Sequence, residues 1–157
     1  MKEKILFKEE QSMRQWWLWL LLFGILAFFI YGDIQQIVFK VPFGNKPAPD
    51  MVLIITTIGM LGLCYFFYQL KLITTITEEY IHIKYSFLVD KKVKWKDIKQ
   101  ATIIQYGFVG YGLRLSFKHG TVYNASGNKG LQIQSKYGKF VVGTQKPEEL
   151  KLLILNV

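Results

Sequence analysis

Three glycine-containing stretches of this chain have residue types that could hold a phosphate group. They are YGFVGYGLR (residues 106–114), SGNKG (residues 126–130) and GTQKPEEL (residues 143–150). A phosphate-binding loop joins a strand to a helix, so that backbone N–H groups at the helix start point at the anion. The first two stretches lie between predicted strands and lack the pattern G-x-x-x-x-G-K-S/T. We interpret their glycines as residues of turns and of close strand approach.

The stretch GTQKPEEL precedes a predicted helix, but its charges oppose a phosphate site. Pro147 suits the first helical turn, where its missing N–H is not needed, and Glu148 and Glu149 favour the positive end of the helix dipole. Two carboxylates at that end would repel an anion. The stretch therefore predicts the end of a last strand at Gly143 and Thr144, followed by a C-terminal helix.

No residue constellation of the chain predicts catalysis. His82 and His119 are the only histidines, and neither has carboxylates at metal-ligand spacing. Asp90 and Asp97 flank a basic segment and are interpreted as its neutralising partners. The single cysteine, Cys64, lies in an apolar segment and allows no disulfide within the chain. We therefore expect a protein that is not an enzyme and that has no metal site and no cofactor.

A row of lysines is the most informative charged feature. The stretch DKKVKWKDIK (residues 90–99) contains Lys91, Lys92, Lys94, Lys96 and Lys99. On an extended chain Lys92, Lys94 and Lys96 share one face, and Val93 and Trp95 share the other. Such a row can be a solvated face that protects an edge strand, or it can contact the anionic surface of a membrane. Nucleic acid is disfavoured, because no aromatic side chains accompany the lysines in a base-stacking pattern.

Two uncharged apolar segments predict membrane-spanning helices. Residues 16–31 read WWLWLLLFGILAFFIY and residues 51–70 read MVLIITTIGMLGLCYFFYQL. About 20 apolar residues cross the ~30 Å hydrocarbon core as a helix. The first segment ends in bulky aromatic residues, which favours a retained helix over a cleaved signal peptide. We predict a cytoplasmic segment (residues 1–15), two transmembrane helices (16–32 and 51–70), an extracytoplasmic loop (33–50) and a cytoplasmic domain (71–157).

Charge and aromatic residues predict the orientation of this hairpin. Lysine and arginine are concentrated before the first helix and after the second, so both termini are expected in the cytoplasm. Five aromatic residues are expected to anchor the helices at the inner interface: Trp16, Trp17, Trp19, Tyr65 and Tyr68. Gly24, Gly59 and Gly62 are expected to let helices approach closely. That approach serves an antiparallel hairpin or, alternatively, a homo-oligomer formed through Gly59 and Gly62.

The region after the second helix predicts a β domain. It carries 14 basic and 6 acidic residues. Alternating runs of four to eight residues recur about every ten residues, and turn material such as HG, SGN and YGK separates them. In the last run, PEELKLLILNV, the residues Leu150, Leu153 and Ile154 share one helical face. The pattern predicts a barrel of about seven antiparallel strands capped by a C-terminal helix.

The chain resembles bacterial membrane proteins that carry a pleckstrin-homology-like (PH-like) domain. The resemblance is carried by VKWKDIKQA (residues 93–101), YGLR (111–114), NASGNKGLQI (124–133) and GTQKPEELKLLI (143–154), and by the tryptophan-rich segment after FKEEQ (7–11). It implies two N-terminal transmembrane helices followed by a cytoplasmic PH-like barrel. It implies no catalytic residues. The basic loop with which some relatives bind phosphoinositides has no counterpart that can be aligned here.

These observations lead to a non-enzymatic protein of the bacterial inner membrane. A two-helix hairpin in the lipid bilayer anchors a PH-like binding module, which engages a protein segment or anionic lipid headgroups of the inner leaflet. The alternative is an accessory or assembly subunit of a larger membrane complex that acts through its transmembrane helices. A small-molecule enzyme at the loops GYGLR and SGNKG would need a pocket with converging polar groups.

Overall fold

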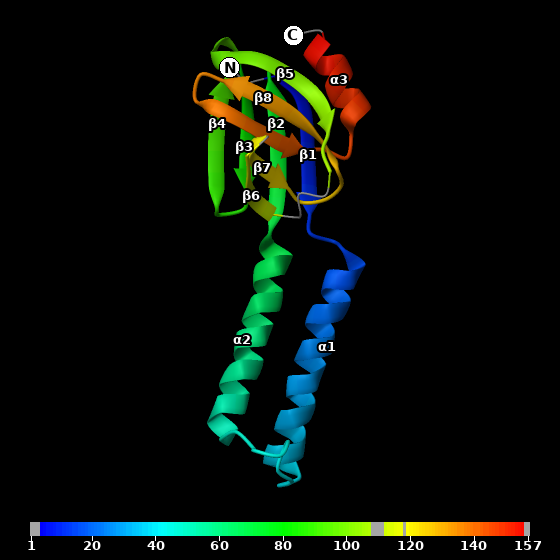
Figure 1. Cartoon of the computed structure of the whole chain (residues 1–157), viewed down its shortest axis with the longest axis vertical. Coiled ribbons are helices and arrows are strands. Elements are labelled where there is room, and N and C mark those ends of the chain that lie inside the picture. The colour runs from blue at the N-terminus through cyan, green and yellow to red at the C-terminus, as the bar shows by residue number, and fades with distance from the viewer. Residues whose placement is uncertain (1–3, 108–111, 118, 156–157) are drawn as a thin grey trace. The chain divides into compact units, whose positions relative to one another are not determined.

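The chain forms two compact units in a computed structural model (Figure 1). The structure describes residues 4–107, 112–117 and 119–155. The helical unit comprises Arg14–Gln69, and the β unit comprises Met1–Met13 together with Leu70–Val157. The β unit is therefore built from two separate parts of the sequence, and the helical unit is an insertion between them.

The helical unit contains two helices that are long and apolar enough to cross a membrane. Helix α1 (Trp16–Asp33) continues into a π-helical turn, η1 (Ile34–Val38), and helix α2 (Asp50–Gln69) follows after a connection. The helices pack through a small cluster of Leu22, Leu26, Met60 and Cys64. Most of the other large apolar side chains of both helices are exposed. Helices of this kind suit a lipid environment, because apolar side chains that face hydrocarbon do not need to be buried inside the protein.

Polar contacts fix the connection between the two helices. Thr57 Oγ1 donates a hydrogen bond to Asp33 Oδ2 over 2.6 Å, which ties α2 to the end of α1. Gln36 Nε2 donates to the carbonyl of Ala48 and to Asp50 Oδ1 over 2.7 and 2.6 Å. The ring of Phe43 packs so close to Gly32 that a Cβ there would lie 2.9 Å from it. The connection is therefore ordered by its own side chains.

The first sheet of the β unit has four antiparallel strands in the order β1-β2-β3-β4. They are β1 (Ile5–Ser12), β2 (Lys71–Thr77), β3 (Tyr80–Tyr85) and β4 (Val89–Lys94). β3 shows the alternation that the sequence predicts for the strands of this region, because Ile81, Ile83 and Tyr85 are buried. Ser12 pairs with Lys71 at the point where β1 ends and β2 begins. The two ends of the helical unit are thus connected to adjacent strands.

The second sheet has five strands in the order β5-β8-β9-β7-β6. They are β5 (Ile98–Gln105), β6 (Gly112–Ser116), β7 (Gly120–Asn124), β8 (Lys129–Ser135) and β9 (Gly138–Gly143), and a 3-10 turn, η2 (Trp95–Asp97), precedes them. All pairs are antiparallel except β7 with β9, which is parallel. Helix α3 (Pro147–Leu155) contacts β5, β8 and β1.

The two sheets pack on each other through their apolar faces. Residues with almost no exposed surface include Leu72, Ile76, Ile81, Ile83 and Val93 in the first sheet, and Leu131, Ile133, Phe140 and Val142 in the second. Leu150 of α3 is buried as well, as its helical face predicts. Burying each such side chain contributes about 1.5–3 kcal/mol. The core therefore depends on both sheets and on the C-terminal helix.

The barrel prediction was wrong in three respects. The sheets are not closed into a barrel, because no pairing joins the edges of one to the edges of the other among the described residues. The described part of the chain contains nine strands rather than about seven, and one pair is parallel. Strand β1 comes from the segment before the first helix, which was predicted only as a cytoplasmic N-terminal segment. The predicted C-terminal helix is present.

Candidate functional site

β5 is an edge strand of the β unit and has a groove beside it. β5 is the outermost strand of its sheet and pairs only with β8 among the described strands. β5 and β1 are each eight residues long, and no other strand among the described residues is longer. An edge strand presents unpaired N–H and C=O groups to which another extended chain can pair.

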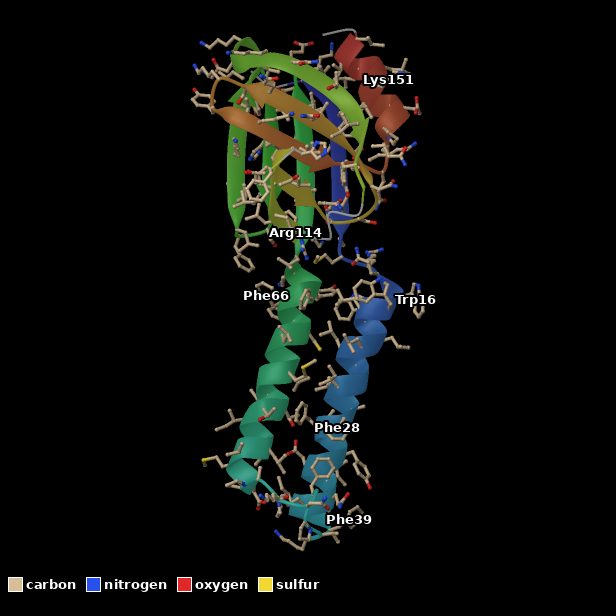
Figure 2. The ribbon with its side chains drawn as sticks, viewed as in Figure 1. Trp16, Phe28, Phe39, Phe66, Arg114 and Lys151 are labelled. Atoms are coloured by element: carbon tan, nitrogen blue, oxygen red, sulfur yellow. The ribbon has the colours of Figure 1, made fainter. Side chains whose placement is uncertain are left out.

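A groove of about 310 Å³ runs between this edge and α3. Ala101, Thr102 and Ile103 line it from β5. Glu148, Lys151, Ile154 and Leu155 line it from α3, and Figure 2 marks Lys151 on this helix. Ala101 and Ile103 pair with Ile133 and Leu131 and therefore lie on the sheet face that is packed in the core. The groove has an apolar floor and a charged rim, and it can receive alternate side chains of an added strand.

The predicted basic residues divide between different surfaces. Lys92 and Lys94 are exposed on the outer face of β4, as expected from the alternation. The strand ends at Lys94, so Lys96 lies on the following 3-10 turn and is not in the same row. Lys99 is exposed on β5, two residues before Ala101. The structure therefore brings one of the five lysines onto the strand that borders the groove.

Lys91 lies on the inward face of β4. Its Nζ is 4.2 Å from the centroid of the Phe140 ring in the other sheet, which is a cation–π contact. Burial lowers the pKa of this lysine below its ordinary value, because an apolar environment disfavours the charged form. Lys91 joins the two sheets and does not belong to the outer basic face.

Asp97 and Lys136 form an ion pair where η2 meets the end of β8. Lys136 Nζ lies 2.8 Å from Asp97 Oδ1, and the Lys136 amide donates to the carbonyl of Asp97 over 2.9 Å. The hydrogen bond from Lys136 lowers the pKa of the Asp97 carboxyl, and the same contact raises the pKa of Lys136. Asp97 is thus a neutralising partner, as the sequence predicted, but of a lysine far along the chain.

Asp90 pairs with His82 on the outer face of the first sheet. His82 Nε2 lies 2.7 Å from Asp90 Oδ1, and this hydrogen bond is the main reason that the pKa of Asp90 is lowered. Asp90 was predicted to neutralise the basic segment, and its pairing with His82 was not predicted. No group of three or more potential metal ligands occurs among the residues that the structure describes.

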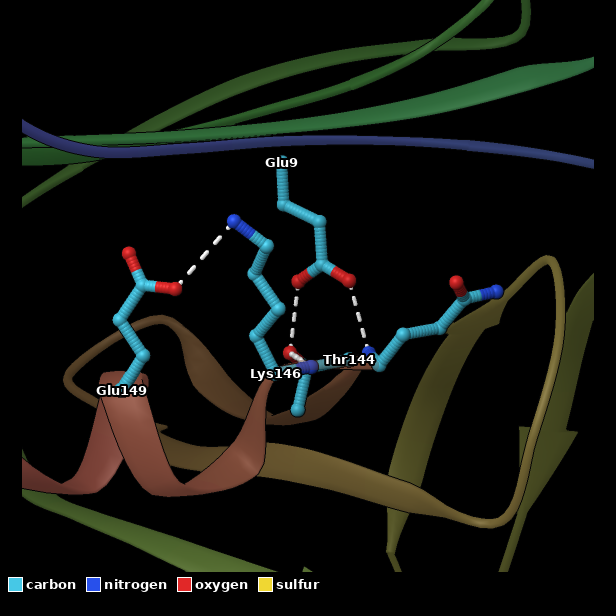
Figure 3. A network of polar contacts seen from close by, with 5 residues as sticks. Glu9, Thr144, Lys146 and Glu149 are labelled. Atoms are coloured by element: carbon cyan, nitrogen blue, oxygen red, sulfur yellow. Dashed lines mark hydrogen bonds and ion pairs between the residues drawn. The ribbon is translucent and has the colours of Figure 1, made fainter.

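Glu9 of β1 is a buried carboxylate, and no pattern in the sequence predicted it as a site residue. Its Oε2 accepts a hydrogen bond from Thr144 Oγ1 over 2.6 Å, and its Oε1 accepts one from the amide of Gln145 over 2.7 Å (Figure 3). Gln11, also buried, donates from Nε2 to the carbonyl of Gly143 over 2.7 Å. Together these bonds attach β1 to GTQKPEEL, between the end of β9 and the start of α3.

The glycine-containing stretches are turns and close contacts where the structure describes them. Gly127 has a φ of +84° between β7 and β8, and Gly112 has a φ of +98° at the start of β6. A Cβ on Gly130 would lie 2.7 Å from the carbonyl oxygen of Val142. These findings match the interpretation as turns and close strand approach. Residues 108–111 of YGFVGYGLR lie outside the described residues.

The predicted residues of the helices also occupy distinct environments. Trp16, Trp17, Tyr65 and Tyr68 are exposed, and Trp19 packs against the cluster between the helices. Figure 2 shows Trp16 and Phe66 near one end of the helix pair and Phe39 near the other. Gly24, Gly59 and Gly62 have open space where a Cβ would be, so none of them lies at the contact between α1 and α2.

Comparison of the chain with models of protein families, with curated proteins and with solved structures finds no match.

Proposed function

We propose that this protein is a non-enzymatic, membrane-anchored binding module that holds an extended protein segment at the β5 edge. The groove between β5 and α3 is the observation that carries the proposal. An added strand would form main-chain hydrogen bonds with β5 and would direct every second side chain into the apolar floor. The exposed Lys99 and Lys151 favour acidic residues in the bound segment.

A protein segment fits the basic residues better than the surface of the protein's own membrane does. Lys94 pairs with Tyr80, at the end of the first sheet opposite to Lys71. Because a strand advances about 3.3 Å per residue, that end is roughly 20 Å from Lys71, where the chain leaves the second apolar helix. Lys96 and Lys99 follow Lys94 in sequence. An acidic protein partner can bind these lysines even where they do not touch the membrane surface.

The anchoring half of the proposal rests on the two apolar helices and on the resemblance to bacterial PH-like membrane proteins. A mostly-β unit with a C-terminal helix agrees with this resemblance, although the two sheets do not form the barrel that it implies. We assign the protein to the bacterial inner membrane, with both termini and the β unit in the cytoplasm. Ser12 pairs with Lys71, so the chain leaves the β unit and returns to it at neighbouring residues. This pairing supports a helical hairpin whose two ends are on one side of the membrane.

Peptide binding tests the proposal directly. The probe is an eight-residue peptide of alternating aspartate and valine, which matches the length of β5. The control is the same peptide with lysine in place of aspartate. We expect the acidic peptide to bind the full-length protein in detergent, measured by fluorescence anisotropy, at least about tenfold more tightly than the basic one. Ala101→Arg, which fills the groove, should weaken this binding, and Lys92→Ala on the other sheet should not. Equal binding of both peptides, unaffected by Ala101→Arg, would refute the proposal.

Cysteine labelling tests the orientation. In a Cys64→Ser background, a cysteine at Lys46 in the connection should react with a membrane-impermeant maleimide added to intact cells. A cysteine at Lys96 should react only after the membrane is opened. The reverse pattern would place the β unit outside the cell.

A second candidate, an accessory subunit that acts through its helices, has one observation in its favour. Leu20, Leu21, Gly24, Ile25, Phe28 and Phe29 line an apolar depression of about 490 Å³ on α1. Gly24 is therefore available for close approach of another helix. Mass measurement of the detergent-extracted protein would support this role if a partner or a second copy co-purifies, and a lone monomer would count against it.

A further inference from the structure

One end of the β unit carries an unusual set of exposed apolar side chains. Phe87 and Leu88 in the turn between β3 and β4 are 67% and 47% exposed. Leu113 and Leu115 of β6 are 47% and 87% exposed, and Phe117 after β6 is fully exposed. We call these five residues the juxtamembrane apolar surface.

Local structure does not account for these residues. Turns favour glycine, asparagine, aspartate and serine, and nothing in turn chemistry requires phenylalanine and leucine at an exposed tip. β6 is the outermost strand of its sheet, and edge strands usually carry charged residues that prevent pairing and aggregation. An apolar edge strand and an apolar turn in one unit indicate that these side chains are covered by something apolar.

The position of the turn indicates what covers it. The amide of Ser86 donates to the carbonyl of Lys71 over 2.8 Å, so Phe87 follows a residue that is bonded to the start of β2. Helix α2 ends at Gln69, only two residues before Lys71. The turn is therefore tied to the point at which the chain leaves an apolar helix of membrane-spanning length.

The start of β6 lies toward the same end of the β unit. Gly112 pairs with Asn124 on β7, and Tyr123 pairs with Val142 on β9. The next residue of β9, Gly143, accepts a hydrogen bond from Gln11, one residue before Ser12. In Figure 1 the β6 edge of the second sheet lies toward the start of β2, and the β5 edge lies at the opposite end of the unit.

We propose that the juxtamembrane apolar surface inserts into the lipid interface and holds the β unit against the membrane. Phenylalanine and leucine side chains bury favourably about 5–10 Å into the boundary between headgroups and acyl chains. Arg114 is exposed between Leu113 and Leu115 and is marked in Figure 2. The covalent link through Leu70 makes this contact intramolecular in effect, so little entropy is lost when it forms.

This orientation has a consequence for the groove between β5 and α3. β5 and β6 are opposite edges of one sheet. A β unit that rests on the membrane through β6 directs the β5 edge away from the membrane. Contact of these exposed residues with lipid is independent of what binds at β5.

Depth-dependent quenching of a fluorescent label tests the proposal. The full-length Cys64→Ser protein, with one cysteine at Phe87, Leu115 or Lys96, is labelled with an environment-sensitive fluorophore. It is then reconstituted into vesicles of phosphatidylcholine and phosphatidylglycerol. Lipids with a spin label near the headgroup should quench the labels at Phe87 and Leu115 at least about twofold more than the label at Lys96.

Two outcomes would overturn the proposal. If the labels at Phe87 and Leu115 emit as in water and are quenched no more than the label at Lys96, the surface does not enter the lipid. If they emit as in an apolar environment but spin-labelled lipid does not quench them, a protein surface such as a second copy covers them. A further variant, Leu113→Ser with Leu115→Ser, should reduce quenching at Phe87, because the contact loses two of its five apolar side chains.

Discussion

Thr144 Oγ1 donates a hydrogen bond to Glu9 Oε2 over 2.6 Å and so joins two residues that lie on opposite sides of the helical insertion. Glu9 precedes both apolar helices in the sequence, and Thr144 lies between the last strand and the C-terminal helix. The β unit consequently needs the N-terminal segment as a structural part. The two ends of the helical unit are held in adjacent strands, at Ser12 and Lys71, by the same sheet.

Removal of the Glu9 carboxylate should destabilise the β unit. Glu9→Ala leaves the Thr144 hydroxyl and the Gln145 amide without their acceptor in a buried place, which costs about 1.5–3 kcal/mol for each strong bond lost. Thermal unfolding of the full-length protein in detergent should show a lower midpoint. Glu10→Ala is the matched control, because Glu10 forms an exposed ion pair with Lys71 and such pairs contribute about 0–1 kcal/mol. Equal effects of the two changes would contradict the role given to Glu9.

The ion pair of Asp97 with Lys136 should make stability depend on pH. The folded state lowers the pKa of Asp97 from 3.8, so its contribution is present above that value and is lost as the pH falls below it. The folded state raises the pKa of Lys136 from 10.5, so its contribution is present below that value and is lost at higher pH. The stability difference between wild type and Asp97→Asn should therefore be largest near neutral pH and shrink at both extremes.

Denaturant unfolding at several pH values measures this difference. Lys136→Met removes the same pair from the other side, and its profile should follow that of Asp97→Asn. A difference between wild type and Asp97→Asn that stays constant down to about pH 3 would show that the pair does not stabilise the fold.

The hydrogen bond between Thr57 and Asp33 should stabilise the helix pair. Thr57→Val removes the donor to Asp33 Oδ2, and hydrogen bonds between membrane helices contribute about 0.6–1.7 kcal/mol. Thr56→Val is the control, because Thr56 Oγ1 donates to the carbonyl of Val52 within α2. Unfolding by a denaturing detergent, followed by circular dichroism, should begin earlier for Thr57→Val than for Thr56→Val. No difference would indicate that the bond is not maintained in micelles.

The sequence predicts most elements because their signals are local. Ile81, Ile83 and Tyr85 alternate with polar residues and thereby identify a strand, and Leu150 with its helical neighbours identifies α3. β1 escapes prediction because two of its inward residues, Glu9 and Gln11, are polar and interrupt the apolar alternation. Their burial depends on partners more than 130 positions away in the chain.

The arrangement of the elements depends on contacts that no local pattern contains. The parallel pairing of β7 with β9 and the separation into two sheets are set by long-range pairing. Lys91 looks like part of a basic row in the sequence, but the side-chain alternation of β4 turns it inward, over Phe140. The groove likewise combines β5 with α3, which lie more than 40 residues apart, so only the folded chain contains it.

Backbone hydrogen exchange at β5 measures the central claim most directly. The full-length protein in detergent is incubated in deuterated buffer with and without the alternating aspartate and valine peptide. If an extended segment pairs with the β5 edge, the exchange of amides in residues 98–105 slows when the peptide is present, and Ala101→Arg abolishes the effect. Unchanged exchange in residues 98–105, with peptide bound elsewhere or not at all, would contradict the account.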